Sequence, residues 1–230
     1  MVIISDSDKQ KAQRKLMQFM TLYGDKYEPY YKEYIDREFL GTSFEKNVEK
    51  DLMDQVYSAT GVYDNIPNIY DTFIEEMLKH YSIDGNLVEV AAGFYPGLSE
   101  KISLRQKSGT IIIYEPKIIV ESNEKFKIIK ESITESTIVN NVDLIYALRP
   151  HAATETIIKM ANKNDVDMFI GLCGCIPFLN YDDFDDLSYG ISDWYHDLEE
   201  LVKKTLPSNR NYEMYKIPNL KRPIIRTYRR

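Results

Sequence analysis

The chain has 230 residues, a formal net charge of −7 and a hydrophobic content of 43%. This length and apolar content suit one large folded domain, or one domain with an appendage, and they exclude a mainly disordered chain. The acidic balance argues against broad, non-specific binding to nucleic acid, because such binding depends on neutralising phosphates.

The first part of the chain is predicted to be helical. It begins without a basic leader, and no apolar run is long enough to span a bilayer, so we expect a cytoplasmic protein with no membrane partner. Apolar residues recur at helical spacing three times between residues 6 and 82. The tyrosine-rich stretch 23–34 fits helix packing or homodimer contacts better than base stacking. We predict a helical N-terminal extension over residues 1–84, which caps the domain that follows.

After Gly85, short β-branched runs alternate with helical patterns. We predict strands at 86–91, 110–114, 126–129, 142–147 and 166–172, and helices at 97–107, 116–121, 132–139, 151–163 and 189–206. The strands are nearly continuous apolar runs, as in a parallel sheet covered on both faces. Two further strands, at 212–217 and 224–228, predict an antiparallel hairpin. Residues 85–230 are therefore predicted to form one α/β domain with a seven-stranded, mostly parallel sheet.

The end of the first predicted strand has a ligand-binding pattern. An apolar run that contains Glu89 breaks at Ala91, Gly93 and Tyr95 and resumes as a helix, which is how α/β proteins bring backbone close to a nucleotide-like ligand. The second predicted strand ends at Glu115, near the roughly 20-residue offset at which an acid binds ribose hydroxyls. Neither Gly-x-Gly-x-x-Gly nor Gly-Lys-Ser/Thr is present, which argues against dinucleotide and P-loop sites. The pattern predicts a nucleoside-containing cofactor.

Residues 88–96, Val-Glu-Val-Ala-Ala-Gly-Phe-Tyr-Pro, resemble the first motif of class I S-adenosylmethionine-dependent methyltransferases. That motif is an acid followed by spaced glycines. The resemblance covers about residues 86–228 and implies a Rossmann-like seven-stranded sheet whose last strand is antiparallel. It also implies S-adenosylmethionine as the cofactor.

The resemblance assigns roles to individual residues. Glu89 is expected beneath the methionine end of the cofactor, Glu115 at the ribose, and Glu131 at the adenine edge. Tyr146 lies in a segment that resembles the fourth motif, and with the turn residues it completes the expected cofactor site.

The turn departs from the family motif in its glycines. Ala91 and Tyr95 stand where the first and third glycines are common, which leaves Gly93 alone. A left-handed backbone at Ala91 would cost about 1–2 kcal/mol. We therefore expect the turn to follow another path, with Pro96 in the first turn of the helix. The alternative interpretation is a strand–helix junction in a cofactor-free α/β protein.

Candidate catalytic residues follow the fourth predicted strand. Methyl transfer from a sulfonium needs alignment and, for some acceptors, removal of a proton, and both are expected at the carboxyl ends of the strands. His151 is a candidate general base, or the first polar residue of a helix. Arg149 is a candidate clamp for an anionic acceptor, or a partner of the acidic loop at 182–186.

Two cysteines, Cys173 and Cys175, follow the fifth predicted strand. With only three histidines in the chain they are too few for a four-ligand zinc site, so no metal is expected. Two cysteines also give no disulfide framework. We interpret both as small buried packing residues.

We expect methyl transfer to a small or unidentified acceptor. The motif Asp/Asn-Pro-Pro-Tyr/Phe is absent after the fourth strand, which removes the main sequence support for amide and nucleobase amino acceptors. The alternative from a different class is a non-catalytic protein that keeps the fold, with or without the cofactor, because the glycine pattern is eroded. A third interpretation is an RNA methyltransferase that uses the basic segment 221–230, although this segment also fits an edge strand kept soluble by charge.

Overall fold

The structure is a computed structural model, and it describes residues 69–93, 96–118, 120–173, 191–217, 220 and 222–230. The predictions made for residues 1–68, Tyr95, Cys175 and the loop 182–186 fall outside these ranges and stay predictions. The division of the chain at residue 84 stays a prediction for the same reason.

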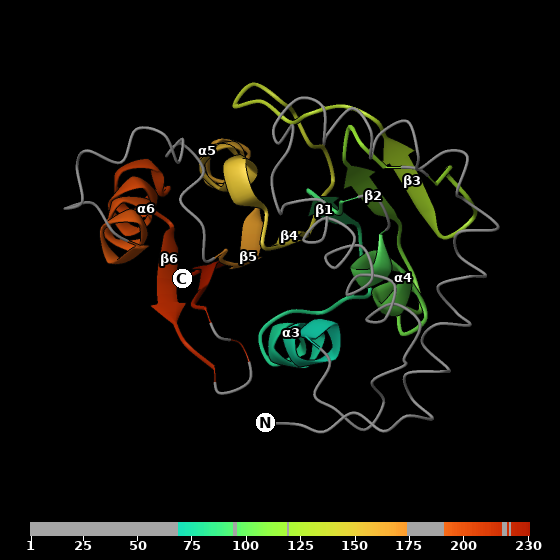
Figure 1. The fold of residues 1–230 in the computed structure, drawn as a ribbon, viewed down its shortest axis with the longest axis horizontal. Helices are drawn as coiled ribbons and strands as arrows, with labels where there is room; N and C mark the ends of the chain where they lie inside the picture. Colours follow the sequence, from blue (N-terminus) through green and yellow to red (C-terminus); the bar gives the residue numbers. More distant parts are fainter. Residues whose placement is uncertain (1–68, 94–95, 119, 174–190, 218–219, 221) are drawn as a thin grey trace, which may run out of the picture.

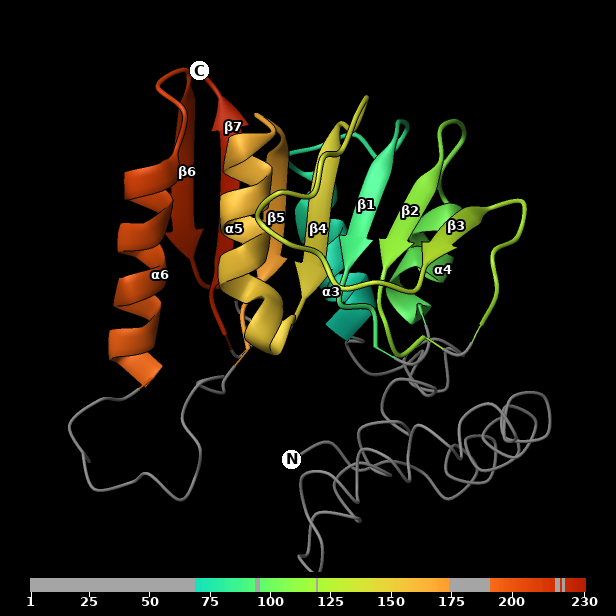
Figure 2. The same ribbon diagram turned by 90° about the horizontal axis from the view of Figure 1, so that it is seen from above.

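Seven strands form one sheet in the order β3-β2-β1-β4-β5-β7-β6 (Figure 1; β7 is labelled in Figure 2). Their bounds are β1 Leu87–Val90, β2 Ile111–Tyr114, β3 Phe126–Ile129, β4 Leu144–Leu148, β5 Asp167–Gly171, β6 Arg210–Tyr215 and β7 Ile224–Arg229. The first five strands run parallel to one another, and β7 is antiparallel to both of its neighbours, β5 and β6. The predicted seven-stranded sheet with a reversed last strand is therefore confirmed.

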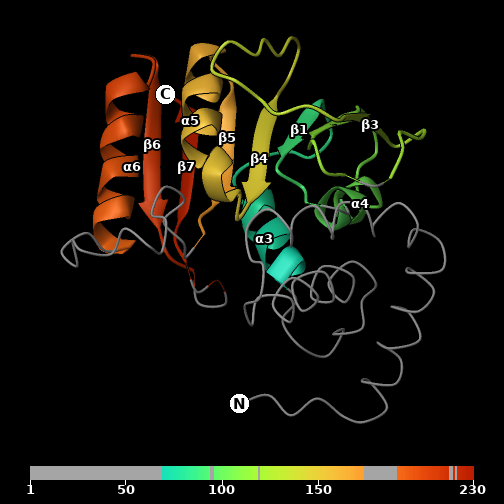
Figure 3. The same ribbon diagram turned by 45° about the horizontal axis from the view of Figure 1, so that its top comes forward.

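Helices cover both faces of the sheet, as its apolar strands require (Figure 2). Helices α3 Ile69–Leu78 and α4 Gly97–Ser103 lie on one face, and α5 Thr154–Lys163 and α6 Ile191–Thr205 lie on the other. Successive side chains of a strand point to opposite faces of the sheet and so pack in two separate cores. Leu87, for example, packs in the core on the α3–α4 face and Val88 in the core on the α5–α6 face. Helices α5 and α6 lie side by side (Figure 3), and their apolar faces share the second core.

Helix α3 belongs to the core of the sheet although the sequence predicted it within the N-terminal extension. The ring of its fully buried Phe73 packs on the ring of Phe169 in β5, with centroids 4.9 Å apart. Full burial of such a side chain stabilises the fold by about 1.5–3 kcal/mol. None of the described helices combines the length and the apolar character that a bilayer span requires.

The helix predicted at 132–139 does not form. Hydroxyl and amide side chains bind the backbone there instead. The Thr134 N–H donates to Thr137 Oγ1 at 2.9 Å, and Asn164 Nδ2 donates to the Thr137 carbonyl oxygen at 2.9 Å. Such bonds offer the backbone an alternative to the helical ladder, so this prediction is wrong.

The helix predicted at 116–121 is also absent from the described residues of that segment. The Lys117 N–H donates to Glu115 Oε1 at 2.9 Å, so the acid at the end of β2 closes a turn where a helix would have begun. Helix α4, earlier in the chain, does form, but it ends at Ser103, whereas the prediction extended it to residue 107. The connections from β2 to β3 and from β3 to β4 are consequently loops in the described ranges.

Candidate functional site

The carboxyl ends of the parallel strands border a cavity of about 820 Å³. This volume lies within the range of about 300–1,000 Å³ that is usual for small-ligand sites. The cavity is centred on the end of β1, which lies between β2 and β4, so the direction of strand order reverses there. Ligands of open α/β sheets bind at this switch point. Six of the nine residues predicted for the site line the cavity: Glu89, Ala91, Gly93, Glu115, Arg149 and His151.

The turn after β1 is left-handed at two positions. The backbone φ is +59° at Ala91 and +74° at Gly93. The Ala91 N–H donates to the Tyr114 carbonyl oxygen at 3.1 Å, which continues the β1–β2 ladder past the end of the strand. Our expectation that the turn would avoid a left-handed Ala91 is therefore wrong. The turn keeps the conformation that glycine usually supplies, at a cost of about 1–2 kcal/mol.

Glu115 holds this turn with its carboxylate. Oε2 accepts the Gly93 N–H at 3.1 Å, and Oε1 accepts the Lys117 N–H at 2.9 Å. The side chain is only 8% exposed, yet it lines the cavity. A carboxylate has about four lone-pair positions, so one fixed by two backbone groups still accepts hydrogen bonds from a ligand. The arrangement suits a ligand with two neighbouring hydroxyls.

Glu89 is buried between the sheet and α4. Its carboxylate accepts a hydrogen bond from Ser99 Oγ, which lies 2.6 Å from Tyr146 Oη. Because Ser99 has one hydroxyl proton and gives it to Glu89, Tyr146 is the donor to Ser99. Burial raises the pKa of Glu89 to about 7, the bonds from Ser99 lower it, and the charge of Glu115 raises it. Glu89 therefore gains and loses its proton near neutral pH.

Two predicted cofactor residues do not reach the cavity. Tyr146 is fully buried behind Ser99, so it supports Glu89 rather than lining the cavity. Glu131 is exposed on the loop after β3, where its neighbours Ser132 and Ile133 line the cavity instead. Neither residue is therefore among those that line the cavity, and the cofactor contacts expected of Tyr146 and Glu131 stay predictions.

The end of β4 carries left-handed backbone on both sides of Pro150. The φ is +57° at Arg149 and +47° at His151. The Arg149 N–H donates to the Gly171 carbonyl oxygen at 2.7 Å, so the β4–β5 ladder holds this conformation in place. Non-glycine residues with such backbone cost about 1–3 kcal/mol each and cluster at functional sites.

His151 begins a short 3₁₀ helix, His151–Ala153, and also lines the cavity, while its role as a general base stays a prediction. Its Nδ1 lies 3.2 Å from Cys173 Sγ, and the Cys173 carbonyl oxygen accepts the Tyr195 hydroxyl at 2.9 Å. Cys173 is buried, as predicted, and it is disulfide-bonded, so it carries no free thiol. Within the described ranges, no group of three or more His, Cys, Asp or Glu is positioned to hold a metal ion.

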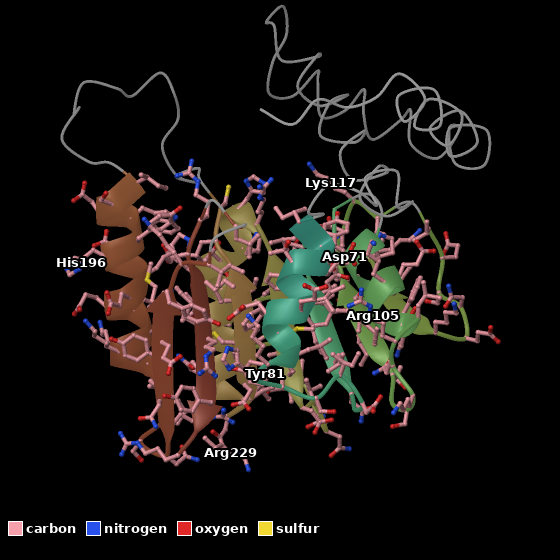
Figure 4. All side chains as sticks on the ribbon, turned by 90° about the horizontal axis from the view of Figure 1, so that it is seen from below. Asp71, Tyr81, Arg105, Lys117, His196 and Arg229 are labelled. Carbon is pink, nitrogen blue, oxygen red and sulfur yellow. The ribbon has the colours of Figure 1, made fainter. Side chains whose placement is uncertain are left out.

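The sequence reasoning missed Ser99 and Arg222. A serine on the buried face of the helix that follows the turn was the signal for Ser99. Arg222 precedes β7, and because β7 is antiparallel its start lies at the carboxyl edge of the other strands. Figure 4 shows Lys117 at this edge and Arg229, near the end of β7, at the opposite edge. The predicted hairpin was the signal for Arg222.

Comparisons with known proteins concern the fold. No protein-family model matches the chain, and no curated protein matches it in sequence. A precorrin-6y C5,15-methyltransferase from Geobacter metallireducens has 9% identity and a TM-score of 0.43, over 69% of this chain and 84% of that one. A putative RNA methyltransferase from Pyrococcus horikoshii has 16% identity and a TM-score of 0.46, over 70% and 82%. Human N-acetylserotonin methyltransferase, solved with S-adenosylmethionine, has 8% identity and a TM-score of 0.47, over 94% and 69%.

The fold assignment rests on the sheet itself. Five parallel strands, a switch point at β1 and an antiparallel β7 reproduce the sheet that the motif resemblance implied. The left-handed turn and the acid of the first motif lie at the end of β1, and a second acid follows β2. The chain therefore has the Rossmann-like fold of class I S-adenosylmethionine-dependent methyltransferases.

Proposed function

We propose that the chain binds S-adenosylmethionine in this cavity and transfers its methyl group to a small-molecule acceptor. One observation carries the proposal. Two buried carboxylates, Glu89 and Glu115, face one cavity from neighbouring strands, and Glu115 is bonded to the turn between them. Such a pair complements a ligand that combines a ribose diol with a cationic end, because a buried carboxylate is stabilised by opposite charge and by donated hydrogen bonds.

Each carboxylate has a separate task in this proposal. Glu115 accepts hydrogen bonds from the ribose hydroxyls, since its orientation is already fixed by Gly93 and Lys117. Glu89, when ionised, attracts the positively charged methionine end. The cofactor supplies an activated methyl group, so the remaining requirement is an aligned acceptor.

The acceptor would approach from the β4–β5 side of the cavity. His151 is proposed to remove a proton from a hydroxyl or amine acceptor, for which an imidazole is suited near neutral pH. Arg149 is proposed to orient the acceptor. Both line the cavity across from Glu115, which lies at the end of β2 on the other side of β1.

A small acceptor is favoured over RNA because the basic C-terminal segment does not act as one patch. Arg226 pairs with Glu213 at 2.7 Å, and Arg229 lies 3.7 Å from Asp165. Arg222 lies at the cavity, on the opposite edge of the sheet from Arg229. The three charges therefore do not follow a single phosphate backbone.

The test is isothermal titration with S-adenosylhomocysteine, with NADH and ATP as controls. We expect micromolar binding of S-adenosylhomocysteine alone. Glu115→Ala should weaken this binding about 10- to 100-fold, the effect of losing hydrogen bonds to a charged group, while Glu115→Asp does less. Glu124→Gln, a change of an exposed acid on the loop before β3, is the matched control and should have no effect.

Two results would contradict the proposal at different points. A folded wild-type chain that binds no S-adenosylhomocysteine excludes the cofactor and leaves the non-catalytic alternative. Wild-type affinity in a folded Glu115→Ala variant excludes the ribose contact but not the cofactor. Far-UV circular dichroism on each sample shows whether the fold is intact.

A further inference from the structure

We infer that the methyl acceptor carries an anionic group, a carboxylate or a phosphate, and that Arg149 and Arg222 bind it together. This inference rests on the proposed function, because it names the acceptor class for the same cavity. It goes beyond that function by adding Arg222 to the site and by predicting the charge of the substrate.

The strand register brings the two arginines to one side of the cavity. Leu148 of β4 pairs with Gly171 of β5, and Gly171 pairs with Ile224 of β7, so these three residues form one row across the sheet. Arg149 is one residue beyond this row in β4, and Arg222 comes two residues before it in β7. Only β5 separates the two strands, so their backbones are about 10 Å apart. Arginine side chains are long enough to reach one small anion from both backbones across this distance.

Hydrogen bonds extend the sheet as far as both arginines. The Arg149 N–H donates to the Gly171 carbonyl oxygen at 2.7 Å, and the Leu172 N–H donates to the Pro223 carbonyl oxygen at 2.9 Å. Each arginine therefore starts from, or directly adjoins, backbone that is paired in the sheet. Both side chains line the cavity. Binding groups that project from such backbone hold their geometry better than groups on free loops.

The charges of the cavity are divided between its two ends. The acids Glu89 and Glu115, with Lys117 beside them, line the part of the cavity formed by β1 and β2, and Arg149 and Arg222 line the part formed by β4, β5 and β7, where the charged lining residues are cations alone. In the described part of the chain, neither arginine is in an ion pair with a carboxylate, and Arg222 hydrogen-bonds to the neutral hydroxyl of Tyr195. A guanidinium is matched by a planar carboxylate or a phosphate, which it binds through two parallel hydrogen bonds. The cationic cofactor at the acidic end leaves the basic end to a second, negatively charged ligand.

Tyr195 of α6 adjoins Arg222. Burial raises the pKa of the Tyr195 hydroxyl, and the neighbouring charge of Arg222 opposes that rise. The same hydroxyl donates to the Cys173 carbonyl oxygen, at the end of β5 between the two arginines. Tyr195 thus links α6 to Cys173, which follows the strand that separates β4 from β7. The contact with Tyr195 also limits where the Arg222 side chain lies.

The experiment uses benzoate and phenyl phosphate as anionic probes and benzamide as a neutral probe of the same shape. Each is titrated into the full chain saturated with S-adenosylhomocysteine, and the arginine Nε–H resonances are followed by NMR. We expect saturable binding of at least one anionic probe, with shifts at the resonances of Arg149 and Arg222, and no matching response to benzamide. Arg149→Met and Arg222→Met should each weaken anion binding about tenfold, the effect of losing one charge-assisted contact.

Arg229→Met is the matched control, because it removes an exposed arginine at the opposite edge of the sheet (Figure 4). It should leave the affinity for the anionic probes unchanged. Equal responses to benzoate, phenyl phosphate and benzamide would overturn the inference. So would unchanged anion affinity in folded Arg149→Met and Arg222→Met variants, and if one variant does not fold the other decides. A wild-type chain that binds no S-adenosylhomocysteine refutes the proposed function instead.

Discussion

Glu89 is expected to make the stability of the folded chain fall as pH rises. Its pKa is about 7 in the folded protein, against an ordinary value of 4.5. The folded state therefore holds the proton more tightly than the unfolded chain. The free energy of unfolding is highest below the unfolded pKa and decreases with pH until the pH exceeds the folded pKa.

The size of this effect follows from the two pKa values. The difference between the two pKa values corresponds to a total loss of about 3 kcal/mol of unfolding free energy. About 2–3 kcal/mol of this loss occurs between pH 5 and pH 8. The physical origin is the burial of the carboxylate, which is 3% exposed and has no cation beside it among the groups that set its pKa. Glu89→Gln keeps the shape and an oxygen acceptor for Ser99 but has no charge to bury.

Chemical denaturation of the wild-type chain and the Glu89→Gln variant at pH 5, 6.5 and 8 tests this prediction. Between pH 5 and pH 8, the unfolding free energy of the wild type should fall by about 2–3 kcal/mol more than that of the variant. All other titrating groups are common to both proteins and cancel in the difference. Glu124→Gln should follow the wild-type curve. Parallel curves for wild type and Glu89→Gln would refute the reasoning.

Three further predictions concern the same turn and the buried network. Affinity for S-adenosylmethionine should weaken about tenfold from pH 8 to pH 6 as Glu89 gains its proton, and calorimetry should find this dependence lost in Glu89→Gln. Ala91→Gly should raise the free energy of unfolding by about 1 kcal/mol because it relieves a left-handed alanine, whereas Ala92→Gly should lower it; no gain at position 91 would contradict the turn geometry. Ser99→Ala should cost about 1–3 kcal/mol, because Glu89 and Tyr146 lose the hydroxyl that joins them, and it should move the Glu89 titration to higher pH.

The parts of the fold that follow from local pattern could be predicted from the sequence. The sequence pattern identified every strand of the sheet to within about two residues. The five parallel strands were found as apolar runs bounded by turn residues, which a sheet covered on both faces favours, and β6 and β7 were found as a hairpin. The helix expected at 132–139 did not form, since the Thr137 hydroxyl and the Asn164 amide bind its backbone, and the spacing of apolar residues does not reveal such competition. Loops between β2, β3 and β4 took the place of two predicted helices.

The candidate site divides in the same way. Glu89 and Glu115 are acids in or at the end of apolar strands, and Glu115 follows the turn at about the 20-residue offset of a ribose-binding acid, so the sequence pattern alone predicted them for the site that they line. Arg222 is far from them in sequence and reaches the cavity only through the reversal of β7, which is a property of the assembled sheet. The left-handed Ala91 was missed because the preference of alanine for ordinary backbone argued against it, and the pairing of its N–H with Tyr114 outweighed that preference.

The position of β7 also bears on the order in which the sheet assembles. This strand follows β6 in the chain, yet it lies between β5 and β6, and among the described strands β6 pairs only with β7. The β6 strand therefore cannot join the sheet until β7 has entered between them. Contacts that close late and span a long stretch of chain slow folding. We therefore expect the β6–β7 hairpin to dock on the edge of β5 as a unit, with β7 making the contact.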